Sequence, residues 1–202
     1  MTFKKIMALG AMAMAAVAMS APTAQAMTPQ WYHNGAILEG QAALHITGKL
    51  STTIIGGGGL ISGPCEVTFA GEASNVNGMA TGTINDGIIS PVCETNVEGC
   101  TIKPTMEGFP WTLTGITVTE TTGVEISKVQ FTTHYISKEP GDCPVPVSTI
   151  LKTGTMTGQV ESTNLKCITF ENHTDSLVTH APLPTLTGDV LGTLCDTTLA
   201  LN

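Results

Sequence analysis

Short runs of alternating apolar and polar residues dominate the chain from residue 65 onward. Residues 65–69 place Cys65, Val67 and Phe69 on one face, and residues 112–119 form a Thr-rich run that also alternates. A period of two is typical of a β-strand that buries one of its faces. The pattern therefore predicts antiparallel strands with one apolar side each.

A break in this alternation marks an irregular strand later in the chain. Residues 124–126 alternate, but their continuation at 129–131 is out of phase by one residue. One extra residue in a strand shifts the phase in this way, so we predict a β-bulge near Ser127 and Lys128.

The rest of the chain supports an all-β fold. Further candidate strands cover residues 36–46, 156–160, 167–170 and 190–201, and turns rich in Gly, Pro, Asn and Asp separate them. No segment keeps a helical period of 3.6 residues. Four glycines at 56–59 lack the Gly-Lys-Ser/Thr continuation of a phosphate loop, which favours a flexible hairpin tip or a strand connection. The pattern predicts an antiparallel β-sandwich.

The stretch from residue 93 to residue 113 holds the strongest local signals. Asn96 and Gly99 are turn formers, and Phe109 and Trp111 then open a new β-like run around Pro110. A period of two places both aromatic rings on one face. We expect Phe109 and Trp111 to be structural anchors in the core; the alternative is that Trp111 is an exposed contact residue.

The first 26 residues have the features of a secretory signal. Lys4 and Lys5 precede an Ala- and Met-rich apolar run at 6–19, and cleavage is expected after Ala26. The run is too short and too rich in Ala for a membrane anchor. Residues 27–202 are then expected to form a single secreted β domain with an irregular N-terminal arm at about 27–60, and no membrane span after cleavage.

Charge narrows the range of partners. The chain has 8 Lys+Arg against 16 Asp+Glu, a net charge of −8, and contains no Arg. Removing Lys4 and Lys5 leaves six cations and a net charge of −10. Such a chain cannot neutralise a phosphate backbone, so we expect no nucleic-acid partner. Its many Thr residues and few charges suit adhesion or self-association through strand edges.

Six cysteines, all after the signal, predict three disulfides in an exported protein. The candidates are Cys65, Cys93, Cys100, Cys143, Cys167 and Cys195. Cys93 with Cys100 is the best local pair and Cys167 with Cys195 the next, although six cysteines allow 15 connectivities. An outer-membrane barrel is an alternative for an exported acidic β chain, but paired aromatic girdles are missing and three disulfides are foreign to that architecture.

No residue pattern predicts an enzyme, a cofactor or a metal site. A Gly-x-Ser-x-Gly nucleophile elbow is missing, and His134 follows a strand-like run as a buried or edge histidine. His173, Asp175 and His180 lie in a polar loop where solvated side chains are the ordinary state. The acidic residues that a glycosidase could use are Glu94, Glu98, Glu107, Glu120 and Glu125, but their number alone indicates no site.

Two aromatic residues stand out in the polar N-terminal arm. Trp31 and Tyr32 serve either as a hydrophobic plug for the domain or as a docking handle. Asn172 begins a glycosylation sequon, but the signal is of a bacterial type, where this modification is uncommon.

Several positions resemble the PraB-type family of secreted alkane-oxidation activators. The positions that carry the resemblance are Cys65, Thr83-Ile84, Cys100-Thr101, the Phe-Pro-Trp-Thr-Leu run at 109–113, Cys143 and Cys167. Residues 27–60 have no counterpart in that pattern, Cys93 and Cys195 are additional, and the C-terminus is longer. The resemblance implies a small exported, non-enzymatic protein at or beyond the bacterial surface.

These observations lead to one leading interpretation of function and two alternatives. The leading one is a secreted or cell-surface protein that acts in adhesion, biofilm or contact with hydrophobic substrates, with self-association or matrix components as partners. The first alternative is a filament subunit in which residues after Ala26 add a strand to a neighbouring copy. The second is a glycan-binding module or a hydrolase.

Overall fold

A computed structural model of the protein describes residues 28–56, 59–118, 120–143, 149–171, 176–180 and 190–202. The expected signal and its cleavage site lie outside the described residues. All regular elements of the described part are strands. They are β1 (Trp31–His33), β2 (Ala36–Ile37), β3 (Gln41–Gly56), β4 (Gly59–Val76), β5 (Met79–Ile89), β6 (Cys93–Glu94), β7 (Cys100–Glu107), β8 (Trp111–Val118), β9 (Thr121–Ser137), β10 (Thr149–Glu161), β11 (Asn164–Phe170), β12 (Ser176–His180), β13 (Val190–Asp196) and β14 (Leu199–Leu201).

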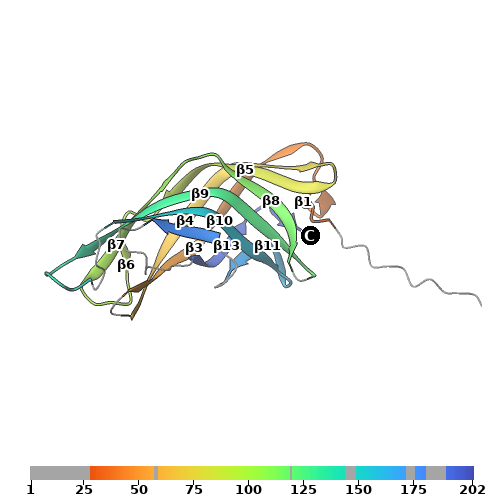
Figure 1. The fold of residues 1–202 in the computed structure, drawn as a ribbon. Helices are drawn as coiled ribbons and strands as arrows, with labels where there is room; N and C mark the ends of the chain where they lie inside the picture. Colours follow the sequence, from red (N-terminus) through yellow and green to blue (C-terminus); the bar gives the residue numbers. More distant parts are fainter. Residues whose placement is uncertain (1–27, 57–58, 119, 144–148, 172–175, 181–189) are drawn as a thin grey trace, which may run out of the picture.

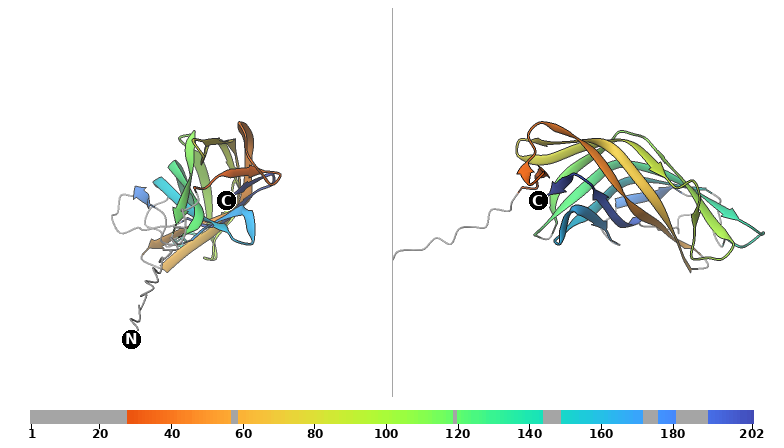
Figure 2. Two further views of the ribbon diagram at one scale, coloured as in Figure 1. Left: turned by 90° about the vertical axis from the view of Figure 1, so that its right-hand side faces the viewer. Right: turned by 180° about the vertical axis from the view of Figure 1, so that it is seen from behind.

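Eight of the described strands form a closed antiparallel barrel, in which the barrel strands pair in the order of the sequence although β6, β7 and β12 come between some of them. The order is β3, β4, β5, β8, β9, β10, β11 and β13, and β13 returns to pair with β3. The all-β prediction is confirmed, but the predicted sandwich is wrong. Alternation shows that a strand buries one face; it does not show whether the sheet closes on itself. Figures 1 and 2 show the strands wrapping around one elongated interior.

The seam between β3 and β13 depends on two glycines. A Cβ atom on Gly48 would lie 2.1 Å from the Thr193 carbonyl oxygen, and one on Gly192 would lie 2.0 Å from the Lys49 carbonyl oxygen. Side chains at these positions would push the two backbones apart. The closure of the barrel therefore requires glycine at both.

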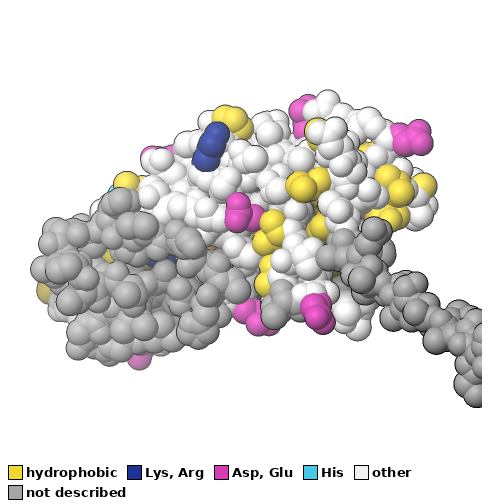
Figure 3. Space-filling view, turned by 45° about the vertical axis from the view of Figure 1, so that its right-hand side comes forward, with side chains coloured by type: hydrophobic (Ala, Val, Ile, Leu, Met, Phe, Trp, Pro, Cys, Tyr) yellow, Lys and Arg dark blue, Asp and Glu magenta, His cyan; other side chains and the backbone are white. Residues whose placement is uncertain are grey.

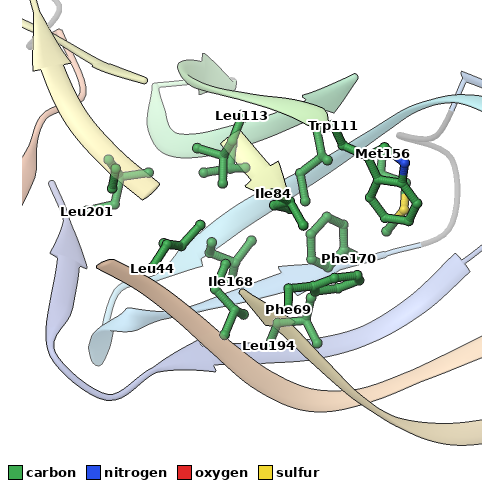
Figure 4. Packing of buried hydrophobic residues seen from close by; sticks show 14 of the residues in the cluster. Leu44, Phe69, Ile84, Trp111, Leu113, Met156, Ile168, Phe170, Leu194 and Leu201 are labelled. Carbon is green, nitrogen blue, oxygen red and sulfur yellow. The ribbon is translucent and has the colours of Figure 1, made fainter. Parts of the chain in front are cut away.

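Apolar side chains from all sides fill most of the interior, and the buried Lys152 lies with its Nζ 5.9 Å from the centre of the Phe131 ring. Figure 4 shows Leu44, Phe69, Trp111, Phe170 and Leu194 pointing into one space from five different strands. Each is 2% exposed or less. An eight-stranded barrel is just wide enough for side chains to fill, so this interior is a packed core.

The bulge predicted in β9 is confirmed. Ile126 pairs with Met156 and Val129 with Gly154, so Ser127 and Lys128 together lie opposite a single residue of β10. Lys128 has a φ of 62°. After this irregular residue the strand again alternates, and every second side chain points into the barrel. Beyond the bulge, β9 leaves β8 and pairs with β7.

The N-terminal arm is shorter than predicted. Residues from Gln41 onward belong to β3, which pairs with β4 on one side and β13 on the other, so an irregular segment up to residue 60 is wrong. The glycines at 56–59 lie where β3 turns into β4, with Gly56 opposite Gly59, as the hairpin interpretation predicts. Gly57 and Gly58 are outside the described residues.

Three disulfides form, as predicted, and they indicate an oxidising compartment. The Cys167–Cys195 pair is confirmed and joins directly opposed residues of β11 and β13. The Cys93–Cys100 pair is wrong: Cys93 bonds to Cys65, and Cys100 to Cys143. The reason is the pairing of β6 with β7, which places Cys93 opposite Ile102 and not opposite Cys100.

Candidate contact sites

A small three-stranded sheet covers one end of the barrel and has two different faces. β1 lies between β14 and β2, with Trp31 opposite Leu201 and Tyr32 opposite Ala200. Trp31 and Leu201 are 2% and 1% exposed and point into the barrel. Because successive side chains of a strand alternate, Tyr32 and Ala200 point outward. Figure 1 places β1 beside the C-terminus, at the end of the molecule away from β6 and β7.

The arm that carries this sheet is fixed by one side chain that sequence reasoning missed. The Asn75 carboxamide accepts a hydrogen bond from the Trp31 amide at 2.8 Å, and donates to the Trp31 and Leu38 carbonyl oxygens. The Trp31 indole donates to the Thr81 carbonyl oxygen at 2.9 Å. Of the two roles expected for Trp31, the structure shows the plug. The position of Asn75 in β4, next to a turn-forming Asn-Gly, is the signal that could have identified it.

The outward face of this sheet forms one wall of a groove. The second wall is the start of β11, where Lys166 donates from its Nζ to the Thr197 carbonyl oxygen at 2.9 Å. The groove has a volume of about 450 Å³, within the range of small-ligand sites. Its lining consists of Tyr32, Asn34, Gly35, Leu165, Lys166, Thr198, Ala200 and Asn202. Sequence reasoning singled out only Tyr32 among these.

A second contact surface lies on the outer side of the barrel wall. We call it the hydroxyl face and define it as Ser74 of β4, Thr81 and Thr83 of β5, Thr112 and Thr114 of β8, and Ser127 of β9. These residues lie opposite one another in two rows across the strands. All six are half-buried, and the Ser74 and Thr81 hydroxyls are 3.2 Å apart. Short side chains thus cover this part of the wall.

Charged residues border the hydroxyl face without interrupting it. Glu72 lies opposite Thr83, and Glu125 lies opposite Thr114. Where Figure 3 draws described residues, uncharged polar groups and backbone make up most of the visible surface, with acidic and apolar side chains scattered among them. Such a face offers many hydroxyls and little charge to a neighbouring surface.

Within the part of the barrel that the structure describes, the apolar cavity of the interior offers very little room for a ligand. One cavity of about 20 Å³ is lined only by apolar side chains, among them Phe69, Met106, Trp111 and Met156. This is about the space of a single water molecule and far below that of a ligand site. The cavity therefore does not support the binding of a hydrophobic substrate inside the barrel.

Phe109 and Trp111 belong to the core. Trp111 is 1% exposed, stacks on Phe109 with ring centroids 4.6 Å apart, and lies 5.6 Å from the Phe69 ring. Its indole donates to the Glu107 carbonyl oxygen at 2.9 Å. The anchor role is what the sequence predicts, and an exposed contact role for Trp111 is wrong. β8 begins at Trp111, so Phe109 precedes the strand.

The titratable residues considered for catalysis or metal binding are not brought together. His134 lies on β9 with its Nδ1 2.9 Å from the Thr149 hydroxyl, and no group of His, Cys, Asp or Glu in the described residues is arranged to hold a metal ion. His173 and Asp175, and the side chain of His180, lie outside the described residues. The acidic residues belong to different elements: Glu94 to β6, Glu98 to the β6–β7 loop, Glu107 to β7, Glu120 to the β8–β9 turn and Glu125 to β9.

Comparisons with known proteins give no relative. No protein-family model, no curated protein and no solved structure matches the chain. The PraB-type resemblance thus stays a sequence interpretation and assigns no residue a role. In the described part of the chain, no helix is both long and apolar enough to cross a bilayer.

Proposed function

We propose that this chain is an exported, non-enzymatic protein that acts by contact with a cell surface or an extracellular matrix. The observation that carries the proposal is the hydroxyl face, a two-row array of short side chains over four neighbouring strands. Hydroxyl groups both donate and accept hydrogen bonds, and they add no like charge to repel an acidic surface. The three disulfides fit a protein that works outside the cell.

Filament assembly through an N-terminal donor strand is less well supported. In the structure, β1 already pairs with β14 and β2 of its own chain, and Trp31 fills the core. A donor strand would have to leave both partners and expose this indole.

The test is a pair of substitutions that keep the fold but change the hydroxyl face. Thr83→Lys and Thr114→Lys each place an ammonium opposite a carboxylate, that of Glu72 and Glu125 respectively, so stability should change little. The two long charged side chains should nevertheless disrupt close contact. We expect the double variant to be lost from the producing cells or their matrix, measured by immunoblotting of surface and medium fractions.

A matched control places the same charge on another wall of the barrel. Thr169 on β11 also points outward, and its hydroxyl donates to Glu161 at 3.0 Å, so Thr169→Lys gains a neighbouring carboxylate as well. This variant should be retained like the native protein. Equal retention of the double variant and the control would contradict the proposal.

A further inference from the structure

We propose that the groove around Tyr32 binds an acidic saccharide, meaning a sugar unit that carries a carboxylate. This inference rests on the proposed function, because it names the class of matrix component that the protein contacts. The site is distinct from the hydroxyl face: it lies at the end of the barrel, between the outward side of β1 and β14 and the start of β11.

The wall of the groove that carries Tyr32 suits a sugar ring. Tyr32 lies between Ile37 of β2 and Ala200 of β14 on the outward face, and its hydroxyl makes no hydrogen bond to any described residue. The face of an aromatic ring is electron-rich and attracts groups of partial positive charge, such as the C–H groups on one side of a pyranose. Small Ala200 leaves room beside the ring. Tyr32 therefore offers both a stacking surface and a polar tip.

The rim supplies neutral groups that can bind sugar hydroxyls. Asn34 and Asn202 are exposed, and each carboxamide can donate and accept at once. The Thr198 hydroxyl is held in place because it donates to the Asp196 carboxylate at 3.0 Å. An aromatic wall with amides at its rim matches a ligand that alternates C–H faces with hydroxyl groups.

Charge selects an acidic sugar over a neutral one. Lys166 carries the only charged side chain among the described residues that line the groove, although the chain has twice as many acidic as basic residues. Its Nζ donates one hydrogen bond to the Thr197 carbonyl oxygen, which fixes the ammonium at the rim and leaves two N–H groups for a ligand. A carboxylate is the complementary group.

A peptide fits this site less well. Extended peptides bind by adding a strand to the edge of a sheet, which here is β2 or β14, whereas Tyr32 lies on the central strand β1 and not on an edge strand. The groove also has few apolar residues, chiefly Leu165 and Ala200, to anchor peptide side chains.

The experiment titrates the oxidised, signal-free protein with hexagalacturonate and with neutral maltohexaose, followed by NMR chemical shifts. We expect hexagalacturonate to bind more tightly. Tyr32→Ala should weaken its binding by about tenfold or more, whereas Tyr32→Phe should retain most of it. Lys166→Gln should weaken the binding of hexagalacturonate by about two- to fivefold and leave the binding of maltohexaose unchanged. Lys103→Gln, an exposed lysine on distant β7, is the matched control and should change neither.

Each outcome decides the inference. Failure of hexagalacturonate to bind, or unchanged binding by a folded Tyr32→Ala variant, would overturn it. Equal affinity for the two sugars would overturn the acidic specificity, and shifts confined to residues outside the groove would overturn the location. If the protein is retained on cells but binds no sugar, the groove inference fails and the proposed function stands. If it binds the sugar but is not retained on cells, the proposed function fails.

Discussion

Replacing Trp111 with Ala should remove a large share of the stability of the barrel. The indole is 1% exposed and contacts two other aromatic rings, those of Phe69 and Phe109. Truncation deletes these contacts, leaves a cavity between β5 and β9, and frees the Glu107 carbonyl oxygen from its 2.9 Å hydrogen bond. A buried Trp→Ala change costs about 3 to 5 kcal/mol.

The size of the effect follows from the length of the chain. For a domain of this size, 1 kcal/mol shifts the Tm by about 2 to 4 °C, so we expect a loss of about 6 to 20 °C. Trp111→Phe keeps an aromatic ring beside Phe109 but loses the hydrogen bond and part of the volume, and should cost about 1 to 2 kcal/mol.

Thermal and urea denaturation of the oxidised protein measure these losses. Thr112→Ala is the matched control. The Thr112 side chain is next to Trp111 in the sequence but points outward, so this variant should lose no more than about 0.5 kcal/mol of unfolding free energy. A Trp111→Ala protein that melts within about 2 °C of the native one would show that the ring does not support the core.

Four further predictions concern other parts of the barrel. Replacing Cys100 and Cys143 with Ser opens a loop of 43 residues and should lower the free energy of unfolding by about 4 kcal/mol in urea; an unchanged midpoint would refute this. Asp196→Ala should cost about 2 to 3 kcal/mol by the same assay, because four hydrogen-bond donors, including the His45 and Leu199 amides, lose their acceptor. Burial raises the pKa of Tyr135 well above its ordinary value of 10.0, so above pH 10 the unfolded state ionises before the folded state does, and stability should fall as pH rises. Tyr135→Phe should make the free energy of unfolding fall less steeply between pH 9 and about pH 11. If the dependence on pH is unchanged, other ionising groups cause it. Lys128→Gly should raise the free energy of unfolding by about 1 kcal/mol, because glycine adopts a φ of 62° without strain; a loss would show that the Lys128 side chain itself stabilises the bulge.

Local features of the fold could be predicted from the sequence, because they depend on neighbouring residues. The inward phase of residues 65–69 and the bulge at Lys128 follow from alternation alone. Two hairpin turns could also have been predicted from their Asn-Gly sequences, Asn34-Gly35 and Asn77-Gly78. In each turn the two residues have a positive φ, as two-residue turns of this kind require.

Features that join distant parts of the chain could not be predicted in this way. The partner of Cys93 is Cys65, on a strand 28 residues earlier, and no local signal distinguishes it from Cys100. Barrel and sandwich differ in whether β13 meets β3, and the glycines that permit this meeting also occur in ordinary strands. The groove around Tyr32 is likewise a product of packing, since its walls come from opposite ends of the sequence.

The seam between β3 and β13 also determines when the protein can fold. The His45 amide and the Asp196 carboxylate, which meet beside the seam, are 151 residues apart in the chain. Such long-range pairing slows folding, because the entropy of a long loop is lost before the contacts form. A chain that passes through a membrane from its N-terminus delivers β3 first and β13 last among the eight barrel strands. If the polypeptide is exported as proposed, it must therefore remain open, with the edges of β3 and β11 unpaired, until almost all of it has crossed. A chain truncated before Val190 would keep those edges exposed to other chains.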